Sequence, residues 1–111
     1  MIKRFEVEFL EEANVFLNRL DDRAKRKILN NIFKARYVLD VNLFKKLHHD
    51  VWEFRTIHLR KHYRFLSFWT HDGTKSMVII THGVIKKTNK LPSQEIEKTV
   101  KIMSQYLNDV K

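Results

Sequence analysis

Three short segments in the second half of the chain place the strongest constraint on its fold. Residues 51–57 (VWEFRTI) and 63–69 (YRFLSFW) alternate in polarity with the period of two that indicates β-strands. Residues 76–81 (SMVIIT) form a third, apolar segment, and Asp72-Gly73 before it is a hairpin-turn signal. Consecutive strands joined by short turns predict an antiparallel meander. The apolar third strand is expected at the centre of the sheet, with helices covering both of its faces.

The first half of the chain has the pattern of one strand followed by two helices. Residues 2–9 (IKRFEVEF) alternate as a strand with one solvated face does. From residue 10 to residue 20 the apolar spacing becomes helical, and Asp21-Asp22 can cap a second helix. In that helix the apolar residues recur at spacings of three and four from Ala24 to Leu39, and the opposite face is basic.

The last part of the chain predicts a third helix. Pro92 and Ser93 are typical of a helix start, and an apolar stripe runs from Ile96 to Val110. The predicted order is β-α-α-β-β-β-α, an α+β fold in which an N-terminal helical hairpin and a C-terminal helix pack one antiparallel sheet. With 111 residues, two glycines and one proline, residues 1–111 are expected to form a single domain without a flexible linker.

The chain is strongly basic, with 22 Lys and Arg against 13 Asp and Glu and a formal net charge of +9. Residues 41–91 hold ten of these cations and three of the acids, and therefore +7 of the charge. Such a charge indicates a polyanionic partner, which can be nucleic acid, an acidic protein segment or an anionic membrane. A solubilising surface explains the composition equally well.

Several functional classes are excluded or disfavoured. No cysteine is present, which excludes disulfides and cysteine-based zinc motifs. His48-His49-Asp50 is a poor metal site, because adjacent side chains of an extended segment point to opposite faces, and no metal or cofactor is expected. The N-terminus does not resemble a signal peptide, and no apolar run approaches the roughly 20 residues that span a bilayer. We therefore expect a cytoplasmic protein with no membrane partner.

Basic residues from three segments are expected to converge at one end of the sheet. Arg55 and Arg64 lie on neighbouring strands of the predicted meander, where they can share one face. Lys86 and Lys87 follow the third strand in the turn HGVIKKTNKLP. Arg64 interrupts an apolar and aromatic strand, which is costly unless an anion pairs with it. Glu53 is the alternative, purely structural partner for either arginine.

Arginine and lysine clustered without a metal or an evident nucleophile can bind phosphate and stabilise the charge that develops during its displacement. RNA carries its own nucleophile in the 2′-hydroxyl, so a basic pocket supplies most of what RNA cleavage needs. His82, expected at the end of the third strand, is a candidate to accept or donate the proton. A histidine satisfied by the backbone is at least as good an interpretation.

Three motifs in this order resemble the RelE/HigB-type toxin family, in particular its phage-related branch. They are Trp52-Glu53-Phe54-Arg55, Tyr63-Arg64, and the turn Lys86-Lys87-Thr88-Asn89-Lys90-Leu91-Pro92. The predicted order of elements also fits the fold of that family. The resemblance implies the toxin of a bacterial toxin–antitoxin pair that cleaves mRNA, usually on the ribosome. It also implies a cognate antitoxin, typically an acidic or helix-turn-helix protein.

The leading hypothesis is therefore a ribosome-dependent endoribonuclease toxin. The residues expected at the scissile phosphate are Arg55, Arg64, Lys86 and Lys87, with His82 as the candidate for proton transfer. The residues expected to hold flanking messenger RNA or ribosomal RNA are Arg60, Lys61 and Lys90.

The departures from the family pattern keep two other hypotheses open. Better-known members carry lysines near the first of these strands, where this chain has Val51 and Glu53, and some carry a tyrosine past the basic turn that this chain lacks. Leu91 also stands in place of a common threonine cap. A poor catalytic set favours a ParE-like toxin that inhibits DNA gyrase and cleaves nothing. The other hypothesis is a degenerate toxin that only binds its antitoxin.

Overall fold

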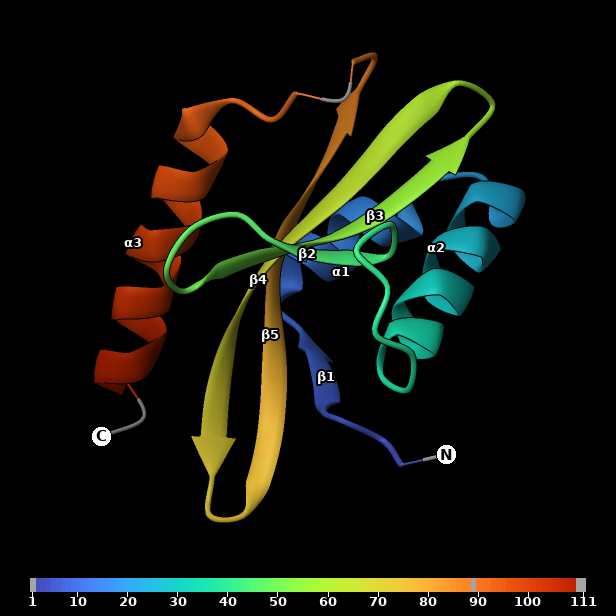
Figure 1. Ribbon diagram of the computed structural model, residues 1–111. Coiled ribbons are helices and arrows are strands. Elements are labelled where there is room, and N and C mark those ends of the chain that lie inside the picture. The colour runs from blue at the N-terminus through green and yellow to red at the C-terminus, as the bar shows by residue number, and fades with distance from the viewer. Residues whose placement is uncertain (1, 89, 110–111) are drawn as a thin grey trace.

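The computed structural model of the protein describes residues 2–88 and 90–109, which form an α+β fold (Figure 1). In chain order the elements are β1 (Glu6–Phe9), α1 (Glu11–Asn18), α2 (Asp22–Ala35), β2 (Phe44–Lys46), β3 (Val51–His58), β4 (Lys61–Asp72), β5 (Lys75–Lys86) and α3 (Ser93–Asp109). The predicted fold class and the predicted helices are confirmed. No helix among the described residues is both long and apolar enough to cross a bilayer.

The strands form one sheet in the order β1-β5-β4-β3-β2, so β5 is an inner strand between β1 and β4, and the central strand is β4. Strands β3, β4 and β5 pair as the expected antiparallel meander, with an irregularity in the β4–β5 register between Leu66 and Ser67. Two features extend the prediction. Strand β1 pairs parallel to β5, which makes the sheet mixed, and β2 adds a short antiparallel strand beside β3. Strand β5 also continues to Lys86, five residues beyond the predicted segment.

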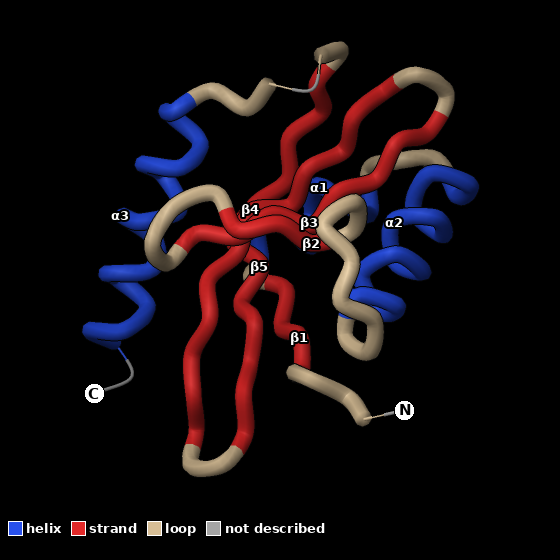
Figure 2. Tube along the Cα trace, viewed as in Figure 1, coloured by secondary structure: helices blue, strands red, loops and turns tan. Residues whose placement is uncertain are grey.

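Helices α1 and α2 cover one face of the sheet, and α3 covers the other (Figure 2). The α1–α2 face carries an aromatic core in which the Phe44 ring stacks on Trp52 and Phe54 at centroid distances of 4.8 and 4.3 Å. On the α3 face the ring of Phe68 meets Tyr106 of α3 at 5.5 Å. The sheet is therefore shielded on both sides, and the charged side chains of Glu53 and Arg64 are buried in it.

Side chains at both ends of helix α2 form hydrogen bonds with its terminal backbone groups. The Asp21 carboxylate accepts a hydrogen bond from the Ala24 amide at 3.0 Å, which confirms it as a cap. At the other end the Arg4 guanidinium donates to the carbonyls of Ala35 and Val38. The helix therefore ends at Ala35, before Leu39, where the apolar spacing in the sequence ends.

The turn between β3 and β4 is strained. Leu59 and Arg60 have φ angles of 49° and 67°, in the left-handed region that glycine and asparagine adopt most readily. Two-residue hairpin turns in which both residues have positive φ favour Asn-Gly. The chain uses Leu-Arg instead, and Leu59 is 79 % exposed. Nothing in the packing of this turn therefore requires a leucine.

Replacement of this pair by the residues that the turn favours should stabilise the fold. We expect Leu59→Asn combined with Arg60→Gly to raise the free energy of unfolding by about 1–2 kcal/mol, because asparagine and glycine adopt the positive φ angles of this turn at a lower cost. Urea denaturation of the purified protein measures the change. Gly73→Ala is the matched control, since Gly73 has a φ of 62° in the other hairpin turn and should lose stability. A loss of stability in the double variant would contradict the claim that Leu59 and Arg60 are strained in this turn.

Candidate functional site

The sheet register brings cations from three strands onto one face. Arg55 of β3 lies directly opposite Arg64 of β4, and Arg64 lies opposite Val84 of β5. Lys86 is two residues further along β5 and therefore shares that face. It is the face under α3, because His82 of the same strand contacts that helix. The expected shared face of Arg55 and Arg64 is thus observed, at the sheet end where β3 and β5 end and β4 begins.

Glu53 binds both arginines of this cluster. Its carboxylate oxygens lie 3.4 Å from Arg55 Nε and 3.5 Å from Arg64 Nε. Glu53 is buried, and Arg64 is only 1 % exposed. Burial raises the pKa of the Glu53 carboxyl, an effect that the charges of Arg64 and Arg55 oppose. Glu53 is therefore the structural partner of both arginines at once, and it holds two like charges next to each other.

Arg64 differs from the other cations because solvent does not reach it. Burial lowers the pKa of Arg64, and the charge of Glu53 opposes that effect. Its Nη2 atom also lies 3.3 Å from Nδ1 of His62, on the same strand and the same face. His62, which is half-buried and lies opposite Lys86, was not among the predicted site residues. The sequence did hold a signal for His62, because residues two apart on a strand share one face and His62 is two residues before Arg64.

The lysines of the turn after β5 have different environments. Lys86 donates a hydrogen bond from Nζ to the carbonyl of Lys90 at 2.9 Å, which closes the turn. Lys87 and Lys90 are exposed. Arg60 and Lys61 are exposed at the β3–β4 turn, at the same end of the sheet. The predicted RNA-contacting residues thus surround the end of the sheet at which Arg55, Arg64 and Lys86 lie.

His82 lies elsewhere than predicted. It is inside β5 and not at its end, because the strand continues to Lys86. It is 2 % exposed, with Nε2 at 3.0 Å from Glu95 of α3 and Nδ1 at 2.8 Å from the Thr81 hydroxyl. This geometry attaches α3 to the sheet. A role in proton transfer stays a prediction, and the burial of both ring nitrogens argues against it.

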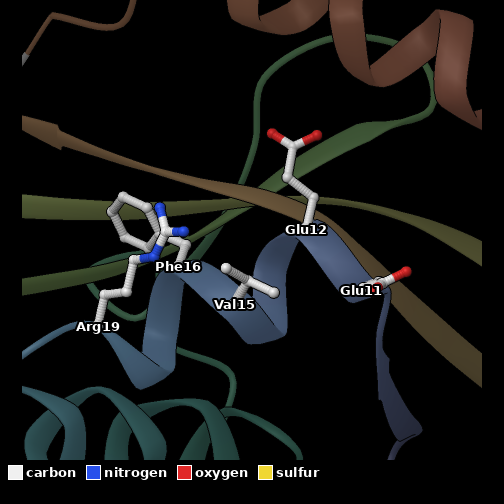
Figure 3. A pocket seen from close by; sticks show the side chains of 5 residues that line it. All are labelled: Glu11, Glu12, Val15, Phe16 and Arg19. Carbon is white, nitrogen blue, oxygen red and sulfur yellow. The ribbon is translucent and has the colours of Figure 1, made fainter.

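A surface hollow of about 470 Å³ lies elsewhere, over α1 (Figure 3). It is lined by Glu11, Glu12, Val15, Phe16 and Arg19. Val15 and Phe16 form its apolar part, and Phe16 packs on Gly83, where a Cβ atom would lie 2.5 Å from the ring. The hollow shares no residue with the basic cluster. In the described part of the chain, no group of three or more His, Asp or Glu residues is placed to hold a metal ion.

An α+β fold with cations from three strands gathered on one sheet face has the side-chain chemistry that can bind phosphate. The particular family follows from the sequence: residues 15–104 match the model of the family described as phage-derived protein Gp49-like (DUF891), and the chain belongs to that family. No curated protein and no solved structure matches the chain significantly.

The Gp49-like family is a family of toxins from toxin–antitoxin systems and is related to the RelE/HigB-type toxins. The observed fold is compatible with a RelE-like fold. Toxins of this family are generally ribonucleases, and each has a cognate antitoxin. The resemblance found in the three sequence motifs is therefore confirmed at the level of the family.

Removal of the Glu53 charge should destabilise the protein. Glu53→Gln leaves two guanidinium groups together without their carboxylate, and we expect the free energy of unfolding to fall by about 3 kcal/mol. Urea denaturation at pH 7 measures the change. Glu97→Gln, at an exposed position of α3, should change it by less than about 0.5 kcal/mol. Equal effects of the two substitutions would show that Glu53 does not hold the arginines.

His82 should make stability depend on pH. Burial lowers the pKa of His82 in the folded protein, against the opposing effect of Glu95. The unfolded chain therefore binds a proton first, and the stabilisation that is present above pH 7 is lost as the pH falls through about 6.5 and below. His82→Gln should flatten this dependence between pH 7.5 and 5.5, as followed by urea midpoints. An unchanged slope in His82→Gln, or the same flattening in His71→Gln on the exposed hairpin, would contradict the assignment.

Proposed function

We propose that this protein is a HigB-like toxin that cleaves mRNA on the ribosome by attack of the RNA's own 2′-hydroxyl. The attacking oxygen forms a bond to the scissile phosphorus, and the bond to the 5′-oxygen of the next nucleotide breaks. One proton leaves the 2′-hydroxyl and another reaches the 5′-oxygen. The observation that carries the proposal is the convergence of Arg55, Arg64 and Lys86 on one face and at one end of the sheet.

The cations would divide the work according to their exposure. Lys87 is exposed, and Lys86 and Arg55 are half-buried, so that these three are placed to contact a phosphate. Arg64 lies beneath them and contributes its charge to the field at the site without reaching solvent. Fixed positive charges stabilise a phosphorane because its negative charge exceeds that of the bound phosphodiester.

His62 is the better placed of the two histidines for proton transfer. Its ring is half-buried, lies 3.3 Å from Arg64 and is opposite Lys86, whereas both ring nitrogens of His82 are engaged under α3. We assign His62 the role of the general base that accepts the 2′-hydroxyl proton.

The exposed cations around the cluster would hold the rest of the substrate. Arg60, Lys61 and Lys90 surround the same end of the sheet, and they are assigned to flanking mRNA or to ribosomal RNA. The cognate antitoxin, expected to be a helix-turn-helix protein, would block this region. Messenger RNA and the ribosome place such activity in the cytoplasm.

Mapping of RNA 5′ ends after brief induction of the protein tests this function. We expect new ends within translated codons in minutes, with no DNA-damage response. Arg55→Gln combined with Lys87→Gln should reduce cleavage about 100-fold or more, because each lost charge weakens stabilisation of the phosphorane. Lys75→Gln combined with Lys101→Gln removes the same charge at exposed positions of β5 and α3 and should retain cleavage.

Two outcomes would contradict the proposed activity, and a third would contradict the proposed site. Intact messages together with a DNA-damage response would favour the ParE-like gyrase inhibitor. Intact messages without that response would favour a degenerate toxin that only binds its antitoxin. Full cleavage by the Arg55→Gln, Lys87→Gln variant would leave the nuclease in place and move its active site elsewhere.

A further inference from the structure

Helix α2 presents a second basic surface, on the face of the sheet opposite the Arg55–Arg64 cluster. Between Asp22 and Asp40 the chain has no acidic residue. The cations of this segment are Arg23, Lys25, Arg26, Lys27, Lys34 and Arg36. Like charges three and four positions apart on a helix repel each other. The surface is therefore a concentration of positive charge without the alternating signs of an ordinary solvated helix.

The exposed residues of α2 form one continuous stripe. Arg23, Arg26, Asn30 and Lys34 follow each other at spacings of three and four, and all are exposed. Within residues 2–88 and 90–109, the side chains of Arg23, Arg26 and Lys34 form no ion pair and no hydrogen bond. The core does not use these cations either, because α2 buries the opposite side, with Ala24, Ile28, Ile32 and Ala35.

Two aromatic rings continue the stripe at its C-terminal end. Phe33 is 43 % exposed and Tyr37 is 38 % exposed. The Arg36 guanidinium lies over both rings, 4.8 Å from the centroid of Phe33 and 5.5 Å from that of Tyr37. A cationic track that ends in solvent-facing aromatic rings is the arrangement that holds single-stranded nucleic acid, in which phosphates meet the cations and bases stack on the rings.

The N-terminal half of α2 lies against the end of the sheet that carries the proposed active site. Lys27 Nζ donates to the Ile57 carbonyl of β3 at 2.6 Å, and Asn31 Nδ2 donates to the Thr56 hydroxyl at 3.0 Å. Figure 1 shows the β3–β4 turn next to this end of α2. That turn contains the exposed Arg60, and the exposed Lys61 follows it at the start of β4.

We propose that the exposed face of α2 from Arg23 onwards, together with Tyr37 in the turn after the helix, is a second RNA-binding surface for a single strand. It extends about 20 Å along the helix. Cations of the stripe hold the phosphates, and Phe33 and Tyr37 stack on bases. An acidic protein segment would also be attracted to the cations, but the exposed rings with their stacked guanidinium favour RNA. The proposal rests on the proposed function only in taking RNA as the partner.

Binding of an RNA that resists cleavage tests the charges. The probe is a fluorescently labelled 15-nucleotide 2′-O-methyl RNA, which lacks the 2′-hydroxyl nucleophile, and anisotropy gives its affinity for the full chain. Arg26→Gln combined with Lys34→Gln should weaken binding about 10-fold at 0.1 M salt and reduce the salt slope by about 1.4, at about 0.7 per lost phosphate contact. Lys75→Gln combined with Lys101→Gln is the matched control and should change affinity less than about 2-fold.

The aromatic rings have a separate test. Phe33→Leu combined with Tyr37→Leu should weaken binding about 5-fold or more and leave the salt slope unchanged, because it removes stacking and no charge. Phe33→Leu alone should give a smaller loss in the same direction, and it provides the test if the double variant does not fold. A polyglutamate peptide is the competing ligand, whose binding the two aromatic substitutions should not affect.

Equal losses in the two charge variants would overturn the proposal, because net charge alone would then explain binding. Unchanged RNA binding in the folded aromatic variants would also overturn it and would favour an acidic protein segment. If the α2 surface does not bind RNA, the proposed function is unaffected, since cleavage is measured separately on cellular mRNA that retains its 2′-hydroxyls. Conversely, if no message is cut, the α2 surface can still be measured with the methylated RNA.

Discussion

The carboxylate of Glu53, placed between Arg55 and Arg64, is the interaction on which the candidate site depends. The pairing of β3 with β4 puts two guanidinium groups directly opposite each other on a face that α3 covers. At an effective dielectric constant of 20, two unit charges 4 Å apart repel by about 4 kcal/mol. Glu53 lies 3.4 and 3.5 Å from the two Nε atoms and offsets that repulsion. The sheet can therefore hold a concentrated positive charge in a covered position.

The two faces of the sheet are stabilised by different interactions. The face under α1 and α2 carries the stacked rings of Phe44, Trp52 and Phe54, and it depends on apolar burial. The face under α3 carries the ionic cluster and the His82–Glu95 contact that attaches the helix. Charged groups can thus be concentrated at one end of the molecule without disrupting the aromatic core. The basic outer face of α2 extends the positive charge to the other side.

Much of this arrangement could be predicted from local patterns. Alternation with a period of two identified the meander and placed Arg55 and Arg64 on one face, and Asp21 capped α2 as expected. The parts that were not predicted depend on contacts between distant segments. The parallel pairing of β1 with β5 and the three-residue β2 leave no periodic signal. His82 is buried because Glu95 of α3 packs over it, thirteen residues further along the chain. The family match supports the interpretation of the motifs. The roles proposed for individual side chains rest on their positions and exposure.

The most direct measurement of the central claim is a nuclear magnetic resonance titration of the protein with a mononucleotide 3′-phosphate. The account predicts that the side-chain Nε resonance of Arg55 and the amide resonances of Lys86 and Lys87 shift together, with a common dissociation constant. Shifts confined to other surfaces, with these three groups unchanged at saturation, would contradict it. The cluster that Glu53 holds together would then be a structural ion network and not a phosphate site.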